Sequence, residues 1–315
     1  MKRLIPLLAL GLSACGNYSN EDLDFQLALP QDGELEAKLP QAISVSDSAE
    51  YYVITRKVVT EFNAIARALV GLVDKVRGIS PTSRKGSQRI WGPWDDDRHP
   101  GWQIRVLMDR VDNPGVPSGF NISYNVQVRS TQIAGAEFAD FMAGSYAPSG
   151  NARRGQGEQH LYIQNMRDIG YPVEDFDQLV QLDLCYQTEQ YPMVVHMFAQ
   201  NQDTAKERQI TYDYEEAADG SGTLYFDITT DRTLSSFDLR FISRWLGSGA
   251  GRADAYAVNR NDLLAGTDCW GPDTRATLSW RIDEGAKNSH ESSLCAFAEP
   301  TDLEAPTCGP GSGQR

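Results

Sequence analysis

The four histidines of this 315-residue chain are its side chains best suited to acid–base catalysis near neutral pH. They are His99, His160, His196 and His290, and each is isolated from the others in the sequence. An alternating strand around His196 would leave that side chain half-buried rather than free to act as a base. The nucleophile elbow GxSxG, the zinc motif HExxH and the phosphate loop GxxxxGK[ST] do not occur. The sequence therefore predicts no catalytic residue, no metal site and no cofactor, and it favours a non-enzymatic protein.

Two runs of carboxylates are the other source of chemistry. Asp95–Asp97 could bind calcium, but calcium loops alternate their ligands around a glycine turn, so we expect a solvated acidic loop instead. Glu215 and Glu216, or the aspartates, could form a glycosidase pair only if two carboxylates faced each other across ~5–9 Å. A glycan-processing enzyme is therefore kept as the second alternative function.

The first fifteen residues, MKRLIPLLALGLSAC, have the order of a secretory leader. Two basic residues precede an apolar stretch, 4–12, that is too short to span a bilayer as a mature helix. Leu12–Cys15 then resembles the lipobox of bacterial lipoproteins. In that family the leader is cleaved before the cysteine, which is acylated, and each buried CH₂ contributes about 0.8 kcal/mol to membrane binding. We predict a signal peptide over 1–14 and lipidation with palmitate at Cys15; an ordinary cleaved leader with an incidental cysteine is the alternative.

The residue after this cysteine is Gly16. In the lipoproteins that the leader resembles, aspartate at that position retains the protein at the inner membrane. Glycine therefore predicts the outer membrane, with the protein facing the periplasm or the cell surface. No later stretch approaches eighteen apolar residues, so the acyl chains are the only membrane attachment that the sequence predicts.

Without Cys15, four cysteines remain, an even number that permits two disulfides in an oxidising compartment. We favour Cys269 with Cys295, whose loop closure would contribute ~3–4 kcal/mol. Cys185 and Cys308 would then form a second pair or both stay free, and Cys185 could equally be a buried thiol in a strand.

Acidic residues outnumber basic ones, 43 against 29, for a formal net charge of -14. This balance argues against nucleic acid as a partner, because phosphate neutralisation needs clustered lysine and arginine. It also argues against peripheral docking on anionic lipid. The 41% hydrophobic fraction is typical of a folded globular protein.

Residues 48–77 show the one strong helical pattern, with apolar side chains spaced by three and four. A helix of that length would be ~42 Å long and could cross an entire sheet. A coiled-coil dimer is the alternative use of its apolar stripe.

From Trp102 onward, apolar and polar residues alternate with the period of half-buried strands. About eleven strands follow, at spacings that favour antiparallel hairpins. They are expected at 102–108, 120–129, 137–146, 157–166, 179–188, 192–199, 207–216, 222–230, 236–246, 253–260 and 274–282. The predicted fold class is mainly β (α+β): a curved antiparallel sheet or half-barrel covered by one long N-terminal helix.

The segments that flank this domain show no sustained periodicity of apolar residues. Residues 15–45 are polar and are predicted to be a flexible tether, and 299–315 a loose C-terminal tail. The organisation is thus a signal peptide over 1–14, the tether, a single helix-plus-β domain over 46–298, and the tail.

Several short motifs resemble those of an uncharacterised family of secreted Gram-negative lipoproteins. They fall within residues 90–298 and are Trp91–Trp94 (WGPW), Asp219–Gly222 (DGSG), Arg244-Trp245, Gly249–Asp254 (GAGRAD), Asp268–Trp270 (DCW) and Cys295–Phe297 (CAF). The resemblance implies pairing of Cys269 with Cys295, which agrees with the pair favoured above. It implies an envelope location but no activity.

Three functions follow as hypotheses. The first is a lipid-anchored envelope protein that acts as a non-enzymatic scaffold or binding protein. The second is a periplasmic carrier of a lipid or other apolar ligand, with the helix as a lid; the third is the glycan-processing enzyme. An apolar or glycan ligand is compatible with the many tyrosines and tryptophans, whose simplest role is core packing. The oligomeric state does not follow from the sequence.

Overall fold

The computed structural model describes residues 20–27, 29–31, 33–40, 47–74, 76–151, 154–173, 179–203, 206–230, 237–259, 262–282 and 291–300. The helices within these ranges are α1 (Asn20–Leu27), α2 (Glu50–Asp74), α3 (Ile163–Asp168) and α4 (Glu291–Leu294). The strands are β1 (Ser83–Lys85), β2 (Gln88–Asp95), β3 (Trp102–Asp112), β4 (Phe120–Ser130), β5 (Ala139–Asn151), β6 (Arg154–Leu161), β7 (Leu179–Gln187), β8 (Met193–Asp203), β9 (Lys206–Glu216), β10 (Gly222–Thr230), β11 (Phe237–Trp245), β12 (Gly251–Asn259), β13 (Asp262–Trp270) and β14 (Ala276–Arg281).

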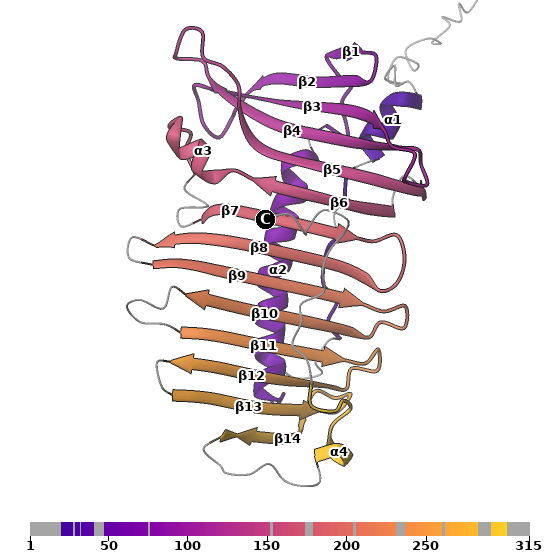
Figure 1. Cartoon of the computed structure of the whole chain (residues 1–315), viewed down its shortest axis with the longest axis vertical. Helices are drawn as coiled ribbons and strands as arrows, with labels where there is room; N and C mark the ends of the chain where they lie inside the picture. The colour runs from indigo at the N-terminus through magenta and orange to yellow at the C-terminus, as the bar shows by residue number, and fades with distance from the viewer. Residues whose placement is uncertain are drawn as a thin grey trace, which may run out of the picture.

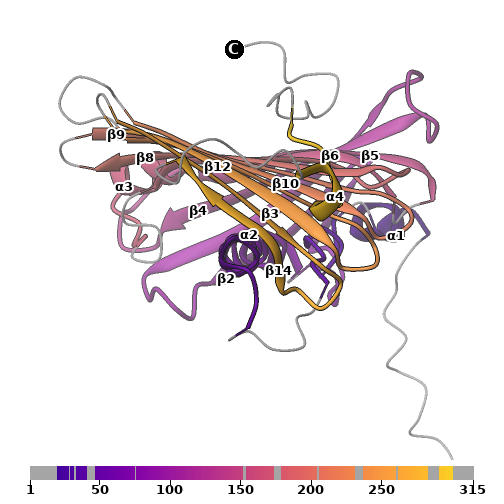
Figure 2. The same ribbon diagram turned by 90° about the horizontal axis from the view of Figure 1, so that it is seen from below.

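These strands form one antiparallel sheet in which each strand pairs with the next along the chain, from β1 to β14. The sheet is open: β1 and β14 lie at its opposite ends (Figure 1). The mainly β, antiparallel fold is as predicted, but the half-barrel is wrong. Closure is not needed, because helix α2 lies across one face of the sheet and buries its apolar side chains (Figure 2).

The sheet has fourteen strands within the described ranges, against about eleven predicted. The additional strands are β1, β2 and β13. In β2 the pairing with β3 is irregular between Trp91 and Trp94, where Gly92 and Pro93 interrupt the alternation. In β13 the inward positions include Gly266 and the buried Asp268, so its apolar alternation is lost. Helix α3 takes the place of the end of the strand predicted over 157–166.

The predicted helix over 48–77 corresponds to α2, which packs its apolar stripe on the sheet. Phe62 is fully buried against Tyr212 and Tyr214 of β9, and Tyr52 meets the ring of Trp270 edge-on at 5.7 Å between centroids. The stripe is therefore used within the chain, which contradicts the coiled-coil alternative. We call the sheet surface toward α2 the helix face and the opposite surface the outer face.

Large rings on the helix face lie over glycines of the neighbouring strand. The ring of Trp270 occupies the place where a side chain at Gly251 would begin, and Trp245 does the same at Gly222. Tyr124 and Tyr186 cover Gly144 and Gly157 in the same way. The glycines thus let aromatic rings lie flat in the core instead of colliding with a neighbouring strand.

The segment predicted as a flexible tether over 15–45 is ordered and packed wherever it is described. Residues 20–27 form α1, and residues 33–40 run beside α2, where Asn63 is hydrogen-bonded to the backbone of Ala37. Leu29 and Leu35 are buried in the core. The backbone N–H of Lys38 donates to the Tyr214 hydroxyl at 2.9 Å. The prediction failed because polar residues of this segment find partners far along the chain, which local sequence does not reveal.

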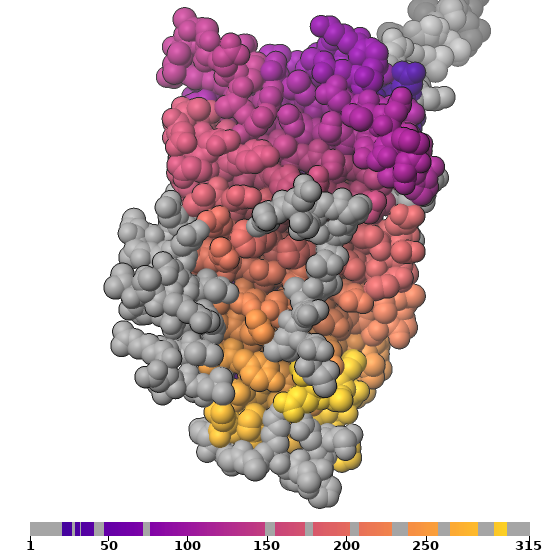
Figure 3. Space-filling model, in the orientation of Figure 1, coloured from indigo at the N-terminus to yellow at the C-terminus, as the bar shows by residue number. Residues whose placement is uncertain are grey.

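Segment 291–300 lies on the outer face, which is turned to the viewer in Figure 3, where α2 is hidden behind the sheet. Arg244 of β11 stacks on Phe297 at 5.1 Å and donates a hydrogen bond to the Ala298 carbonyl. The rest of the tail predicted over 299–315, beyond residue 300, lies outside the described residues.

Candidate functional site

Two histidine–aspartate pairs lie on the outer face in the middle of the sheet. His160 of β6 donates from Nδ1 to Asp183 of β7 at 2.9 Å, and His196 of β8 is hydrogen-bonded through Nδ1 to Asp213 of β9. Since Tyr212 and Tyr214 pack under α2, the alternation of the strand places Asp213 on the opposite face. Burial raises the pKa of Asp213, and the hydrogen bond from His196 opposes that change.

His160 also lies 3.8 Å from Glu158, so it has a carboxylate on each side. The hydrogen bond to Asp183 and then the nearby Glu158 carboxylate raise the pKa of His160 to about 9 from its ordinary value of 6.5. The imidazolium form is therefore the main form at neutral pH, which makes His160 a poor general base and a good ion-pair partner.

Charged side chains continue across the next strands of this face. Tyr225 of β10 donates to Asp227 at 2.7 Å, and Arg240 of β11 donates to the same carboxylate at 3.1 Å. We call this set the outer-face ladder; its members are His160, Asp183, His196, Asp213, Asp227 and Arg240. Its members form three hydrogen-bonded pairs, His160 with Asp183, His196 with Asp213, and Arg240 with Asp227.

We expect the stability of the protein to fall as the pH rises from about 6.5 to 9. A histidine with a raised pKa stabilises the fold fully below its ordinary pKa of 6.5 and loses that contribution as the pH passes through about 9. Because the side chain is 36% exposed, solvent screening should limit the loss to about 1 kcal/mol. Chemical denaturation at a series of pH values would measure it, and His160→Gln should remove this part of the pH dependence. An unchanged pH profile in that variant would contradict the assignment.

The carboxylates singled out as a glycosidase pair do not face each other. Glu216 is on the helix face, where it accepts from Tyr214 at 2.9 Å and pairs with Lys38 at 3.1 Å. Glu215 is the next residue of the strand and therefore lies on the outer face. The Glu215–Glu216 pairing is thus wrong as a catalytic arrangement.

The acidic run Asp95–Asp97 is only partly the solvated loop that was expected. Asp96 is buried and accepts hydrogen bonds from Tyr171 and His99, at 2.7 and 2.9 Å. Burial alone would raise the pKa of Asp96, but these bonds outweigh it and lower the pKa. Asp96 therefore holds the β2–β3 connection in place. His290 lies outside the described residues.

Cys269 of β13 is bonded to Cys295, as predicted. This bond ties segment 291–300 to the outer face. Cys185 of β7 is also in a disulfide bond. Its predicted partner, Cys308, and the predicted lipidation site, Cys15, lie outside the described residues, so both assignments stay predictions.

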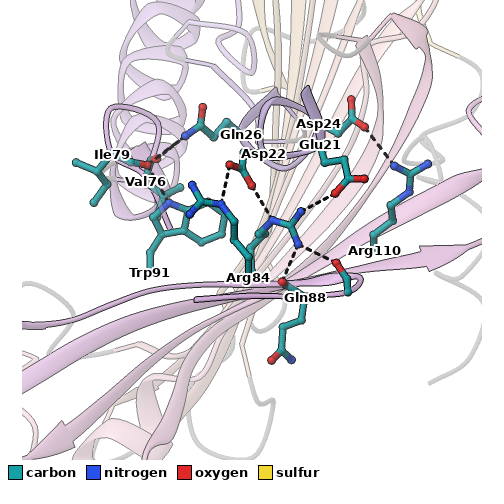
Figure 4. A network of polar contacts seen from close by, with 12 residues as sticks. Glu21, Asp22, Asp24, Gln26, Val76, Ile79, Arg84, Gln88, Trp91 and Arg110 are labelled. Atoms are coloured by element: carbon teal, nitrogen blue, oxygen red, sulfur yellow. Dashed lines mark hydrogen bonds and ion pairs between the residues drawn. The ribbon is translucent and has the colours of Figure 1, made fainter. Parts of the chain in front are cut away.

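A second group of charges holds α1 against the β1 end of the helix face (Figure 4). Asp22 is fully buried and accepts from Arg89 at 2.7 Å and from Arg84 at 3.0 Å. The Arg89 side chain is 4% exposed and also donates to Glu21 at 2.9 Å and to backbone carbonyls in the β1–β2 turn. Gln26 donates to the Ile79 carbonyl at 3.2 Å.

We call this region the α1 corner: α1, the β1–β2 turn around Gly86 and the adjoining end of β3. It contains a pocket of about 360 Å³ whose lining includes both cations, Arg89 and Arg110, and carboxylates, Glu21 and Asp112. Sequence reasoning missed it, because α1 shows no helical periodicity and its ion pairs join residues more than sixty positions apart.

No helix in the described part of the chain is long and apolar enough to cross a membrane. Among the described residues, no group of three or more histidine, cysteine and acidic side chains is placed to hold a metal ion. The geometry therefore provides two features. The outer face carries hydrogen-bonded charged pairs and is linked to segment 291–300 by a disulfide, and α1 is fixed at one end of the sheet.

No family model, curated protein or solved structure matches this chain. The resemblance to secreted Gram-negative lipoproteins therefore stays a prediction that depends on its motifs.

Proposed function

We propose that this protein is an acylated lipoprotein of the bacterial outer membrane that works as a non-enzymatic scaffold or binding protein. The observation that carries the proposal is the leader ending in Leu12–Cys15, which has a basic start, a short apolar stretch and a small residue before the cysteine. The Cys269–Cys295 disulfide supports an oxidising compartment, as expected for an exported protein.

The outer face supports a binding role over a catalytic one. Its histidines, His160 and His196, are hydrogen-bonded to aspartates, and the raised pKa of His160 keeps that side chain protonated at neutral pH. The paired groups form a rigid polar surface, and His160, protonated near pH 7, does not supply a base there.

A carrier with α2 as a lid would need apolar space beneath that helix. Phe62, Ala66 and Leu69 fill the interface with the sheet and are each at most 2% exposed. The described part of the interface therefore resembles a packed core, which favours the scaffold over the carrier.

Metabolic labelling with a palmitate analogue tests the attachment. The wild type should be labelled and should fractionate with the outer membrane, whereas Cys15→Ala should carry no label because it lacks the acceptor thiol. Cys185→Ala is the matched control, since it removes another cysteine and should keep the label. Equal labelling of wild type and Cys15→Ala would rule out this anchor.

A further inference from the structure

The length of chain between the proposed acylation site and the fixed part of the protein is very short. Helix α1 begins at Asn20, five residues after Cys15. At ~3.5 Å per residue, even a fully extended chain would reach only about 17 Å. This step rests on the proposed function, because it requires the anchor at Cys15.

The short reach constrains the whole sheet, since α1 is firmly attached to it. Asp22 and Arg89 form a buried ion pair within the first turn of the helix, and Phe25 is buried against the Arg89 guanidinium at 5.0 Å. Removing one partner of such a pair would leave the other charge buried and uncompensated. Helix α1 therefore cannot easily detach from the sheet and so lengthen the linker between Cys15 and the folded domain, which we call the leash.

We propose that the α1 corner is the membrane-proximal end of the protein and rests at the headgroup surface of a zwitterionic bilayer. The fourteen strands, spaced by ~4.8 Å, place β14 about 62 Å from β1 along the sheet. Only the α1 end is therefore held within reach of the lipid by the anchor.

The charges of the corner suit that surface. The Arg84 and Arg110 side chains are 40% and 36% exposed, the Glu21 side chain is 71% exposed, and Leu23 of α1 is 42% exposed. Zwitterionic headgroups offer phosphate to the cations and ammonium to the carboxylates. The net charge of -14 disfavours an anionic membrane surface, so the proposed surface is zwitterionic.

Energy transfer from the protein to the membrane tests the orientation. Acylated full-length protein carrying a donor dye at Lys85→Cys, or at the control Ala276→Cys on β14, would be reconstituted in phosphatidylcholine–phosphatidylethanolamine vesicles containing a headgroup-labelled acceptor. Both positions are exposed. Transfer should be at least about threefold more efficient from position 85, given the ~62 Å length of the sheet. Intact mass measured on the same samples reports acylation.

The outcomes separate the two proposals. Equal transfer from both positions in protein that carries acyl mass would overturn the orientation and leave the proposed function intact. Absence of acyl mass would overturn the proposed function and this inference with it. Inserting about 20 glycine and serine residues after Gly16 should reduce transfer from position 85 without changing acylation, because the leash is then long. Unchanged transfer in that variant would contradict the role of the short leash.

Discussion

Replacing Gly251 with alanine is expected to destabilise the fold by about 3 kcal/mol. A methyl group there would lie 2.4 Å from the Trp270 ring and 2.6 Å from the Arg244 carbonyl oxygen. The ring cannot easily retreat, because Trp270 is 1% exposed and its indole N–H donates to the Gly249 carbonyl at 3.0 Å. Tyr52 of α2 packs against the same ring, so the strain should extend to the contact between helix and sheet. Urea denaturation with the disulfides intact would measure the loss.

Gly71→Ala is the matched control for this substitution. Gly71 is exposed in the interior of α2, and a methyl group there would meet nothing within 4 Å. The same chemical change should therefore stabilise the protein by about 1 kcal/mol, because alanine has the higher helix propensity. Two variants that both lie near wild-type stability would show that Trp270 does not lie over Gly251.

The same glycines show how far the sequence could predict the fold. Strands such as β4 and β10 alternate apolar and polar residues, since their inward positions hold large side chains, and they were predicted within a few residues. In β13 the inward positions 266 and 268 are glycine and aspartate. Contacts with α2 explain both residue types. The Tyr51 hydroxyl occupies the space at Gly266, and the Tyr51 backbone N–H donates to Asp268. Local alternation could not predict this strand, because its inward residue types are set by contacts with a helix more than two hundred residues away.

The candidate site depends on register in a similar way. The sequence contains His160, Asp183, His196 and Asp213 with no recognisable spacing. Only the pairing of β6 with β7 and of β8 with β9 brings them together as neighbours. The open form of the sheet was equally hidden, because a half-barrel and an open sheet share the same alternation along each strand. Helix α2 covers the helix face, and α1 and residues 33–40 add buried side chains such as Phe25 and Leu35, although their polar composition gave no sign of burial.

Asp254→Leu is expected to destabilise the protein by about 3–5 kcal/mol. Asp254 and Arg252 lie two residues apart on β12, and both side chains are at most 1% exposed. Their bond is bidentate, at 2.7 and 2.8 Å, and Thr267 donates to the same carboxylate at 2.8 Å. Without the carboxylate, the Arg252 guanidinium would stay buried with its main counter-charge removed. Urea denaturation would show the loss as a lower midpoint.

The double variant Arg252→Met/Asp254→Leu separates the worth of the pair from the penalty of breaking it. Removing both charges leaves no buried ion, so most of the loss seen in Asp254→Leu should be recovered, by about 2 kcal/mol or more. Arg252 also donates to the Phe297 carbonyl at 3.3 Å, so segment 291–300 should become more accessible to protease in the double variant even as stability returns. A double variant no more stable than Asp254→Leu would instead mean that the ion pair itself, and not the avoidance of an unpaired charge, holds β12 in place.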